Sequence, residues 1–405
     1  MHTTHWFFIQ YLTPKRMTYT PSLNPRRGFI IEKFQPVTEY DVALVKRVLE
    51  ENDEAVIGIG SAEKSHERGY VMTAGERVEI TDAVLQEAGV DPNRYMLIPI
   101  EDATDTAQWV GDVLQSTPRW HTWYTRNFKN ASMLTSYEKK YAFSIERIDE
   151  QKPTIDYFEA FGDHQALLPR LIPGPAYELM SSMGILDRIN EIYHRKKAVK
   201  STIPQQSRIL FLGGLQPFTG DYAIGNGHIG AVKQAFTHRP QVVIAVGSAQ
   251  HSSTESDPLT VGKRIDVIRY ALQKNKIDAS KFYTIPIKDI ASNACFATKV
   301  ISMCPAFDAA IAGNDWTKQL FGETSCEIIP IERDFVDKKP LSASYVRKTA
   351  MEVLKNCHKK NELVSQRTIA KINRALGTAL DPATKKKLQT VGFYETLHFL
   401  AYAKE

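Results

Sequence analysis

The sequence predicts an α/β protein built from two copies of one parallel-sheet unit. Two observations support this prediction: apolar strand-like runs alternate with amphipathic helical runs, and short motifs recur at fixed spacing along the chain. The chain has 405 residues, of which 43% are hydrophobic, which is enough for two to three domains with ordinary cores. In such sheets, ligands bind at the carboxyl ends of the strands.

The repeat keeps one register with a single shift. Gln216 follows Gln35 by 181 positions, each within a Gln-Pro pair, whereas Gly247 follows Gly60 by 187 positions, each within a Gly-Ser-Ala triplet. The larger spacing then persists through the rest of the unit. The sequence therefore predicts a tandem duplication with a six-residue insertion, 220–225, in the second copy.

Each copy is expected to contain the same elements in the same order. Strands are predicted at 28–31, 55–59, 95–98 and 120–124, and again at 208–212, 242–246, 282–285 and 309–312. Helical patterns lie between them, notably at 41–51 and 260–273. A turn at 171–175, a polar helix at 185–200 and the linker 202–206 place the boundary near residue 203. We expect an N-terminal extension over 1–26, a first domain with a helical tail over 27–203, a second domain over 204–350 and a helical tail over 351–405.

The segment after the first strand of the second copy carries the strongest functional signal. Gly213, Gly214 and Thr219 follow the apolar strand, and Gly227 and His228 begin an amphipathic helix. A helix N-terminus offers unpaired amides and the positive end of the helix dipole, both of which attract phosphate. A histidine in that turn adds a donor beside a developing phosphoryl charge. The segment is therefore predicted to bind phosphates.

This segment resembles the Thr/His-x-Gly-His motif of the nucleotidylyltransferase superfamily. Further motifs, at 245–250, 260–264, 285–289 and 341–347, are similar in order and spacing to those of the archaeal-type nicotinamide-mononucleotide (NMN) adenylyltransferases. The likeness covers residues 27–170 and 207–350. It implies two tandem Rossmann-like, doubly wound parallel-sheet domains and an enzyme that transfers AMP from ATP to NMN, giving NAD and pyrophosphate.

The resemblance also assigns roles to residues of the second copy. His228 would donate to the α-phosphate oxygen, Arg347 would hold the β and γ phosphates, and Thr219 takes the place of the family's first histidine. Other ATP contacts are implied for Gly213, Gly214, Gln216, Phe218, Asn226, Gly227, Asn314, Ser342 and Ser344. Acceptor contacts are implied for Ser248, Arg264, Asp289, Asn293 and Phe296. No protein ligand to a metal is implied, and magnesium would bridge the phosphates of ATP.

Several of these residues have an equally simple structural interpretation. Arg264 is as suited to pairing with a helix end as to touching a ligand, and Asn314 to capping a turn. Phe296 stands where the family has a tryptophan that stacks on the pyridine ring, and is as suited to the core. The insertion 220–225 splits the signature motif. Its Asp221 is interpreted as part of a solvated loop tip rather than as a metal ligand.

The first copy is interpreted as catalytically inactive. Asp41 occupies the position of His228, and a carboxylate facing a triphosphate repels it. The stretch 154–160, at the position of the second copy's Arg347 motif, contains no arginine.

Two alternative functions remain open. The first is another nucleotidylyltransferase, with nicotinate mononucleotide, phosphopantetheine or a sugar or polyol phosphate as acceptor. The second is a nucleotide-binding sensor in which both copies are inactive. Turnover separates the sensor from the enzymes, because only an enzyme releases pyrophosphate.

Charge and cysteine content exclude other classes. The net charge of +5 is spread along the chain, and the triplet 385–387 is interpreted as a solvated lysine face, so no nucleic-acid partner is expected. Four cysteines without a metal-binding spacing suggest reduced thiols and a cytoplasmic location. The apolar patch 6–9 is too short for a membrane span. A homo-oligomer is allowed by the sequence but not specified by it.

Overall fold

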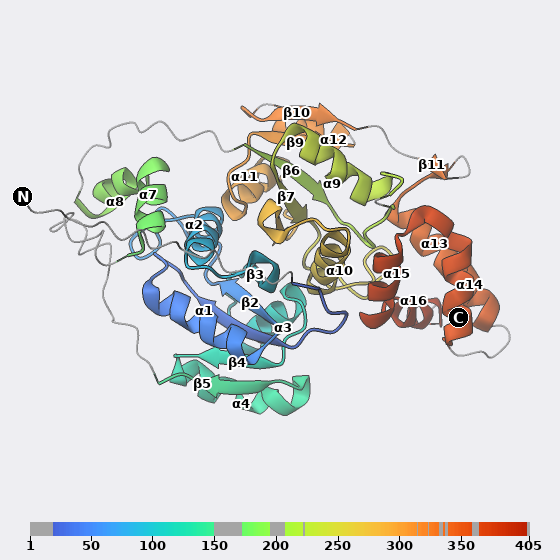
Figure 1. Cartoon of the computed structure of the whole chain (residues 1–405), viewed down its shortest axis with the longest axis horizontal. Helices are drawn as coiled ribbons and strands as arrows, with labels where there is room; N and C mark the ends of the chain where they lie inside the picture. Colours follow the sequence, from blue (N-terminus) through green and yellow to red (C-terminus); the bar gives the residue numbers. More distant parts are fainter. Residues whose placement is uncertain are drawn as a thin grey trace, which may run out of the picture.

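Two five-stranded parallel sheets form the centres of two domains in the computed structural model (Figure 1). The structure describes residues 19–149, 172–194, 207–221, 223–313, 315–322, 324–331, 335–336, 339–358 and 364–402. The predicted boundary near residue 203 and the stretch 154–160 lie outside these ranges, as do residues 1–18. The predicted tandem α/β architecture is confirmed.

The first domain has the strand order β3-β2-β1-β4-β5. Its elements are β1 (Arg27–Glu32), α1 (Glu39–Glu51), β2 (Glu54–Ile59), α2 (Ala74–Glu87), η1 (Pro92–Arg94), β3 (Tyr95–Pro99), α3 (Thr106–Ser116), β4 (Thr122–Thr125), α4 (Phe128–Tyr141), β5 (Ser144–Arg147), α7 (Gly174–Ser182) and α8 (Ile185–His194).

The second domain repeats this order as β10-β9-β6-β7-β8. Its elements are β6 (Arg208–Gly213), α9 (Gly227–His238), β7 (Gln241–Val246), α10 (Val261–Lys274), η3 (Ala279–Lys281), β8 (Phe282–Pro286), α11 (Asn293–Met303), β9 (Ala309–Ala312), α12 (Asp315–Phe321), β10 (Glu327–Pro330), and the small antiparallel pair β11 (Phe335–Val336) and β12 (Lys339–Pro340). The chain direction across the sheet reverses between β6 and β9, so the crevice for a ligand lies at their carboxyl ends.

The remaining helices follow the second sheet, and α15 packs against α10 while α13 packs against α14 and α16 (Figure 1). They are α13 (Ala343–His358), α14 (Gln366–Leu376), η4 (Gly377–Ala379), α15 (Pro382–Thr390) and α16 (Phe393–Tyr402). We call α14 to α16, with η4, the C-terminal helices.

The duplication is visible in the backbone itself. Phe34 and Leu215 both have positive φ, 48° and 51°, and precede Gln-Pro peptides that are cis in both copies. Ser61 and Ser248 match in the same way, at 49° and 50°. The first pair is related by the shorter spacing and the second by the longer one. The six extra residues therefore lie between these points, as the sequence predicts.

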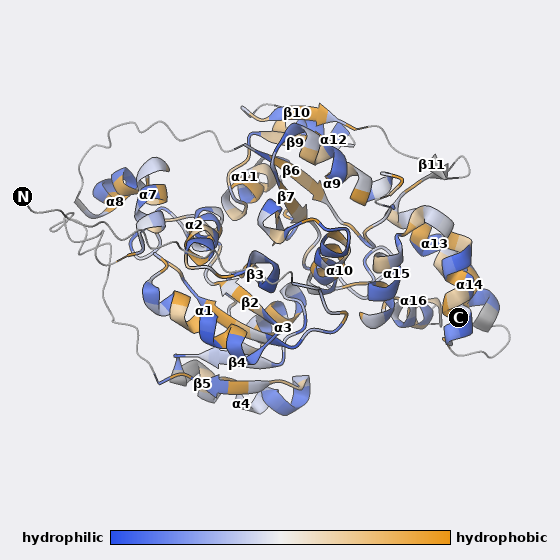
Figure 2. Cartoon of the chain, viewed as in Figure 1, coloured by the Kyte–Doolittle hydropathy of each residue, from blue (hydrophilic) through white to orange (hydrophobic). Residues whose placement is uncertain are grey.

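Apolar β-type runs explain why the strands form where they do. Val242 to Val246 of β7 are fully buried, because helices cover a parallel sheet on both faces. Figure 2 shows β6 and β7 as hydrophobic, whereas α1 presents alternating hydrophobic and hydrophilic residues. Two apolar clusters fill the interior, and each of them includes residues from both domains. The two domains therefore share their cores rather than touching at a polar surface.

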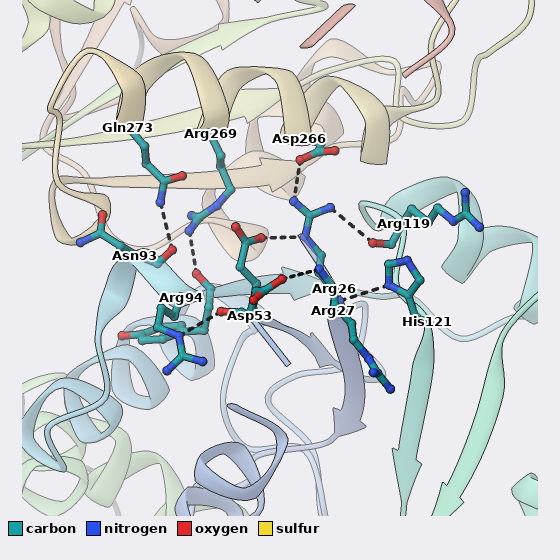
Figure 3. Close-up of polar contacts among 12 residues, drawn as sticks. Arg26, Arg27, Asp53, Asn93, Arg94, Arg119, His121, Asp266, Arg269 and Gln273 are labelled. Carbon is teal, nitrogen blue, oxygen red and sulfur yellow. Dashed lines mark hydrogen bonds and ion pairs between the residues drawn. The ribbon is translucent and has the colours of Figure 1, made fainter. Parts of the chain in front are cut away.

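Two matched ion pairs also cross the domain interface. Arg27 Nη2 of the first domain lies 2.7 Å from Asp266 Oδ1 of the second (Figure 3), and Arg208 Nη1 of the second lies 3.0 Å from Glu79 Oε2 of the first. Arg208 follows Arg27 by the shorter repeat spacing, and Asp266 follows Glu79 by the longer one. Each domain therefore contributes an equivalent arginine, which pairs with an acidic residue on the equivalent helix of the other domain. This arrangement resembles a twofold-symmetric dimer.

Glycines allow the helices to approach across this interface. A Cβ placed on Gly262 of α10 would lie 1.9 Å from Thr117 O, and one on Gly75 of α2 would lie 1.8 Å from Cys304 O. These two contacts are again related by the repeat. Only a residue without a side chain fits at either position.

The interpretation of 385–387 as a solvated lysine face is wrong for Lys387. Its side chain is 2% exposed and its ammonium lies 3.0 Å from Asp266 Oδ2. Lys386 is exposed, as expected. One face of α15 is turned into the protein, and a single-sequence count of charges does not show which one.

We predict that Gly262→Ala lowers the stability of the protein by about 1–3 kcal/mol, because the new methyl group meets a backbone carbonyl that cannot rotate away. The midpoint of urea denaturation measures this. Gly111→Ala is the matched control, since it also lies within a helix but a Cβ there meets nothing within 4 Å. An unchanged midpoint in Gly262→Ala would contradict the close approach of α10 to the carbonyl of Thr117.

Candidate functional site

The candidate site lies in the loops that follow β6, β7 and β8, together with the start of α13. We call residues 213–228, between β6 and α9, the signature loop. It begins at the carboxyl end of the central strand β6 and ends in the first turn of α9. Gly213 and Gly214 lie at its start, where Gly213 O accepts from Gly247 N at 2.9 Å.

Thr219 and His228 are held together at the start of α9. His228 Nδ1 lies 3.1 Å from Thr219 N and 2.9 Å from Thr219 Oγ1. A backbone N–H can only donate, so Nδ1 is the acceptor and the proton of the neutral ring sits on Nε2. His228 also stacks on Phe218, with ring centroids 6.0 Å apart. The ring is therefore fixed in one tautomer, with Nε2–H as its donor.

His228 stays neutral at physiological pH. Burial lowers its pKa to about 4, and a backbone hydrogen bond with Pro217 opposes this shift. An imidazole of this kind donates a hydrogen bond without carrying a net charge. It suits a site that already contains the partial positive charge of a helix N-terminus.

The insertion folds against the start of α9. Gly220 has φ +101°, and a Cβ there would lie 1.9 Å from Asn226 O, so the two ends of the insertion touch. Asn226 Oδ1 accepts from Asp221 N at 2.7 Å, and Asp221 Oδ1 accepts from Ala223 N at 2.8 Å. Asp221 thus forms a local turn. Gly220 and Asn226 thus hold the two ends of the insertion together, and Gly227 at φ +64° leads into the helix.

Arg347 reaches the same loop from α13. Its Nη1 donates to Gln216 O, and its Nη2 donates to Ser344 Oγ at 3.1 Å. Ser342 Oγ accepts from Tyr345 N at 3.2 Å and caps the helix. The structure therefore brings Arg347, Ser342 and Ser344 together at the signature loop.

Two predicted ATP contacts face inward instead. The Gln216 side chain is 3% exposed and bonds to Leu259 N and Asp257 Oδ1, at 3.0 and 2.6 Å. Phe218 is 1% exposed. These contacts favour a structural role for both side chains, which anchor the loop to the protein interior. Asn314 lies outside the described residues.

Arg264 is occupied by backbone carbonyls. Its side chain is 1% exposed and donates to Gly214 O, Gly247 O and Ser248 O, at 2.7, 2.6 and 2.9 Å. Arg77 makes the equivalent contacts in the first domain. The structure therefore favours the structural interpretation of Arg264 over an acceptor contact. It joins the loops that follow β6 and β7.

The residues predicted to contact the acceptor are divided between surface and core. Ser248 N donates to Asp289 Oδ1 at 3.1 Å, and both Asp289 and Asn293 are exposed at the same edge of the sheet. Phe296 is 3% exposed and packs against Trp316, with ring centroids 5.4 Å apart. Phe296 is thus a core residue in this structure, and it is Trp316 beside it that is partly exposed.

The equivalent crevice of the first domain is filled by its own side chains. Thr38 N and Oγ1 donate to Asp41 Oδ2 at 2.9 and 2.8 Å, so the aspartate replaces His228 as the partner of the same threonine. Arg126, at the position of Gly313, lies 3.3 Å from Asp41 Oδ1 and donates to Tyr40 O. A guanidinium therefore occupies the region between the carboxyl ends of β1 and β4.

One contact of the signature loop comes from a segment that motif analysis missed. Gly220 N donates to Ala379 O at 2.8 Å, and Gly220 forms a parallel bridge with Leu380. These are backbone contacts, so no side-chain pattern announces them.

Within the described ranges, no group of three or more histidine, cysteine, aspartate or glutamate side chains is arranged to hold a metal ion. A search of the same residues finds no helix with the length and hydrophobicity of a membrane span.

The chain is similar to known nucleotide-transferring enzymes. Residues 223–375 match the cytidylyltransferase-like family. A nicotinamide-nucleotide adenylyltransferase from Thermococcus kodakarensis is 38% identical over 147 residues, which cover 36% of this chain and 73% of the relative. One from Methanolobus tindarius is 31% identical over 179 residues, 44% of this chain and 96% of the relative. A solved bifunctional NMN adenylyltransferase/ADP ribose pyrophosphatase from Francisella tularensis is 16% identical to this chain. The match covers 49% of this chain and 53% of that one, with a low TM-score of 0.36.

We predict that His228 titrates near pH 4 in the folded protein and near its ordinary 6.5 in urea. Between these values the unfolded chain binds a proton that the folded chain does not. Stability contributed by neutral His228 is therefore lost as pH falls from 6.5 towards 4. Imidazole NMR signals, assigned with a His228→Gln variant, measure both midpoints. A folded-state midpoint near 6.5 would contradict the burial of the ring.

Proposed function

Because the chain belongs to the nicotinamide-nucleotide adenylyltransferase family, we propose that its second domain transfers AMP from ATP to NMN. An oxygen of the NMN phosphate bonds to the α-phosphorus of ATP, and the bond from that phosphorus to the bridging oxygen of the β-phosphate breaks. The products are NAD and pyrophosphate. The chain is an enzyme of the nucleotidyltransferase class.

The Thr219–His228 pair is the observation on which this proposal rests. Nucleophile and leaving group are both anionic, so the reaction needs positioning and charge stabilisation rather than a strong acid or base. Neutral His228, with its proton on Nε2, donates to a non-bridging oxygen of the α-phosphate while Thr219 holds the ring. The N-terminus of α9 supplies further positive potential.

Arg347 supplies the positive charge for the outer phosphates. Its two observed hydrogen bonds use two of its five N–H donors, and both orient the guanidinium at the signature loop. Burial lowers the pKa of Arg347, with Asp257 acting against this, and the group remains a cation at neutral pH. Ser342 and Ser344 lie beside it at the start of α13. Magnesium enters as part of the substrate, bound to the phosphates of ATP.

The acceptor is bound on the opposite side, near Ser248, Asp289 and Asn293. Buried Phe296 favours a second candidate, a nucleotidylyltransferase with a different phosphate-bearing acceptor, because a core ring has no free face for a pyridine. Pyrophosphate release with magnesium and ATP decides between them. NMN is compared with nicotinate mononucleotide, phosphopantetheine and sugar phosphates. Turnover confined to another acceptor would replace NMN, and no turnover with any of them would favour the sensor.

The first domain carries no transfer step in this proposal. Asp41 takes the place of the histidine donor, and Arg126 fills the region that a nucleotide needs. The buried ion pair between them resists displacement, because removing one partner leaves an uncompensated charge. This domain therefore acts as a structural partner of the second.

We predict that His228→Ala lowers kcat by about 10²–10³, with a change in ATP affinity of a few-fold at most, because the donor acts mainly in the transition state. Steady-state pyrophosphate release and ATP titration measure the two effects. His238→Ala, an exposed histidine at the far end of α9, is the control and should retain full activity. If half of the activity survived in His228→Ala, the assignment of His228 as the phosphate donor would be wrong.

We further predict that Arg347→Ala raises the KM for ATP about tenfold or more and leaves the KM for the acceptor within about twofold, since a charge-assisted contact to phosphate is lost on one side only. Arg374→Ala, exposed on α14, serves as the control. Equal losses for both substrates would count against this placement.

A further inference from the structure

The C-terminal helices reach the signature loop through its insertion. Gly220 directly follows Thr219, and its amide donates to Ala379 O at 2.8 Å. The parallel bridge between Gly220 and Leu380 extends this contact. The insertion, which gives the second domain its longer loop, is therefore also where another part of the chain holds that loop.

The segment 377–381 is itself fixed to α15. Asp381 caps the helix, with Oδ1 accepting from Ala383 N at 2.7 Å and Oδ2 accepting from Thr384 Oγ1 at 2.7 Å. Lys385 Nζ donates back to Gly377 O at 2.6 Å. A shift of α15 therefore moves the strand-like segment that pairs with Gly220.

A buried lysine fixes α15 in turn. Lys387 Nζ lies 3.0 Å from Asp266 Oδ2 on α10, donates to Leu23 O at 2.6 Å and sits 5.3 Å from the centre of the Tyr270 ring. Its side chain is almost completely shielded from water. A buried cation is retained only where its partners are well placed, so α15 has little freedom to slide on α10.

Asp266 joins this contact to the domain interface. Its other oxygen, Oδ1, accepts from Arg27 Nη2 at 2.7 Å (Figure 3), and Arg27 Nε bonds to Glu54 Oε2 at 2.7 Å. One carboxylate therefore links β1 of the first domain, α10 of the second and α15. We call Arg27, Asp266 and Lys387 the interface ion cluster.

Helix α10 also fixes the beginning of the same loop, because Arg264 holds Gly214 O. The signature loop is thus held near its start by α10 directly, and at Gly220 by the segment that precedes α15, which itself packs on α10. Thr219 lies between these two points and holds His228.

We propose that Lys387 is a positioning residue: through α15, the interface ion cluster sets the place of Gly220, and with it the Thr219–His228 pair. Docking of the first domain then controls the geometry of the transfer step in the second. A displacement of about 1 Å at reacting groups can reduce the rate about 100-fold. The effect on catalysis rests on the proposed function, whereas the effect on the loop does not.

Three full-length variants test this proposal. Lys387→Met removes the charge, Lys387→Arg keeps it, and Lys386→Met changes the exposed neighbour on the same helix. Amide hydrogen exchange of peptides covering 215–227 is measured without substrate. We expect exchange at least tenfold faster in Lys387→Met, and wild-type exchange in the other two variants. In turnover assays, kcat per folded molecule falls about 10- to 100-fold in Lys387→Met while both KM values stay within about threefold.

Loop exchange unchanged in Lys387→Met, with only the melting temperature lowered, would overturn the proposal and leave Lys387 a stability residue. If Lys387→Met does not fold, Lys387→Gln takes its place, since a neutral amide can still donate a hydrogen bond to Leu23 O while the charge facing Asp266 is lost. The same faster loop exchange is then expected, and its absence overturns the proposal. Faster exchange in a protein whose wild type transfers AMP to no acceptor would refute the proposed reaction while supporting the positioning role.

Discussion

Helix α10 is the element on which the rest of this structure depends, because two buried charges on it serve two different neighbours. The Arg264 side chain points into its own domain and donates to three carbonyl oxygens of the loops that follow β6 and β7. Asp266, two residues later, faces the first domain and α15. Burial alone would raise the pKa of the Asp266 carboxyl, but Arg27 and Lys387 hold it below its usual value. The carboxylate therefore stays charged and keeps all three parts together.

The two domains keep one scaffold but differ in the side chain that begins the helix after the first strand. In both domains a threonine after the Gln-Pro pair hydrogen bonds to the side chain that begins the next helix. Where that side chain is His228, a neutral ring accepts from the threonine. Where that side chain is Asp41, the same position carries a carboxylate, and Arg126 forms an ion pair with this carboxylate. The interface arginines and glycines are meanwhile preserved in both, since the shared core depends on them.

The parts of the site that sequence reasoning predicted are those defined by local pattern. The strand, the glycines and the helix start of the signature loop are local, and the register of the repeat locates the insertion. Reasoning from residue type was less reliable for Gln216, Phe218 and Phe296. These three residue types match a binding motif, but their side chains are buried in this structure. The packing around a side chain decides which way it points.

Hydrophobic periodicity and motif spacing are properties of neighbouring residues, so the sequence alone predicted the α/β class, the duplication, four of the five strands of each sheet and the position of the signature loop. The three-dimensional structure was needed to show that the domains share their cores, that Lys387 is buried against Asp266, and that Ala379 holds Gly220. These contacts join residues far apart in the chain through backbone atoms and buried charges. The energy of these contacts depends on the distance between the two groups and on how well they are shielded from water. Neither quantity can be read from one stretch of sequence.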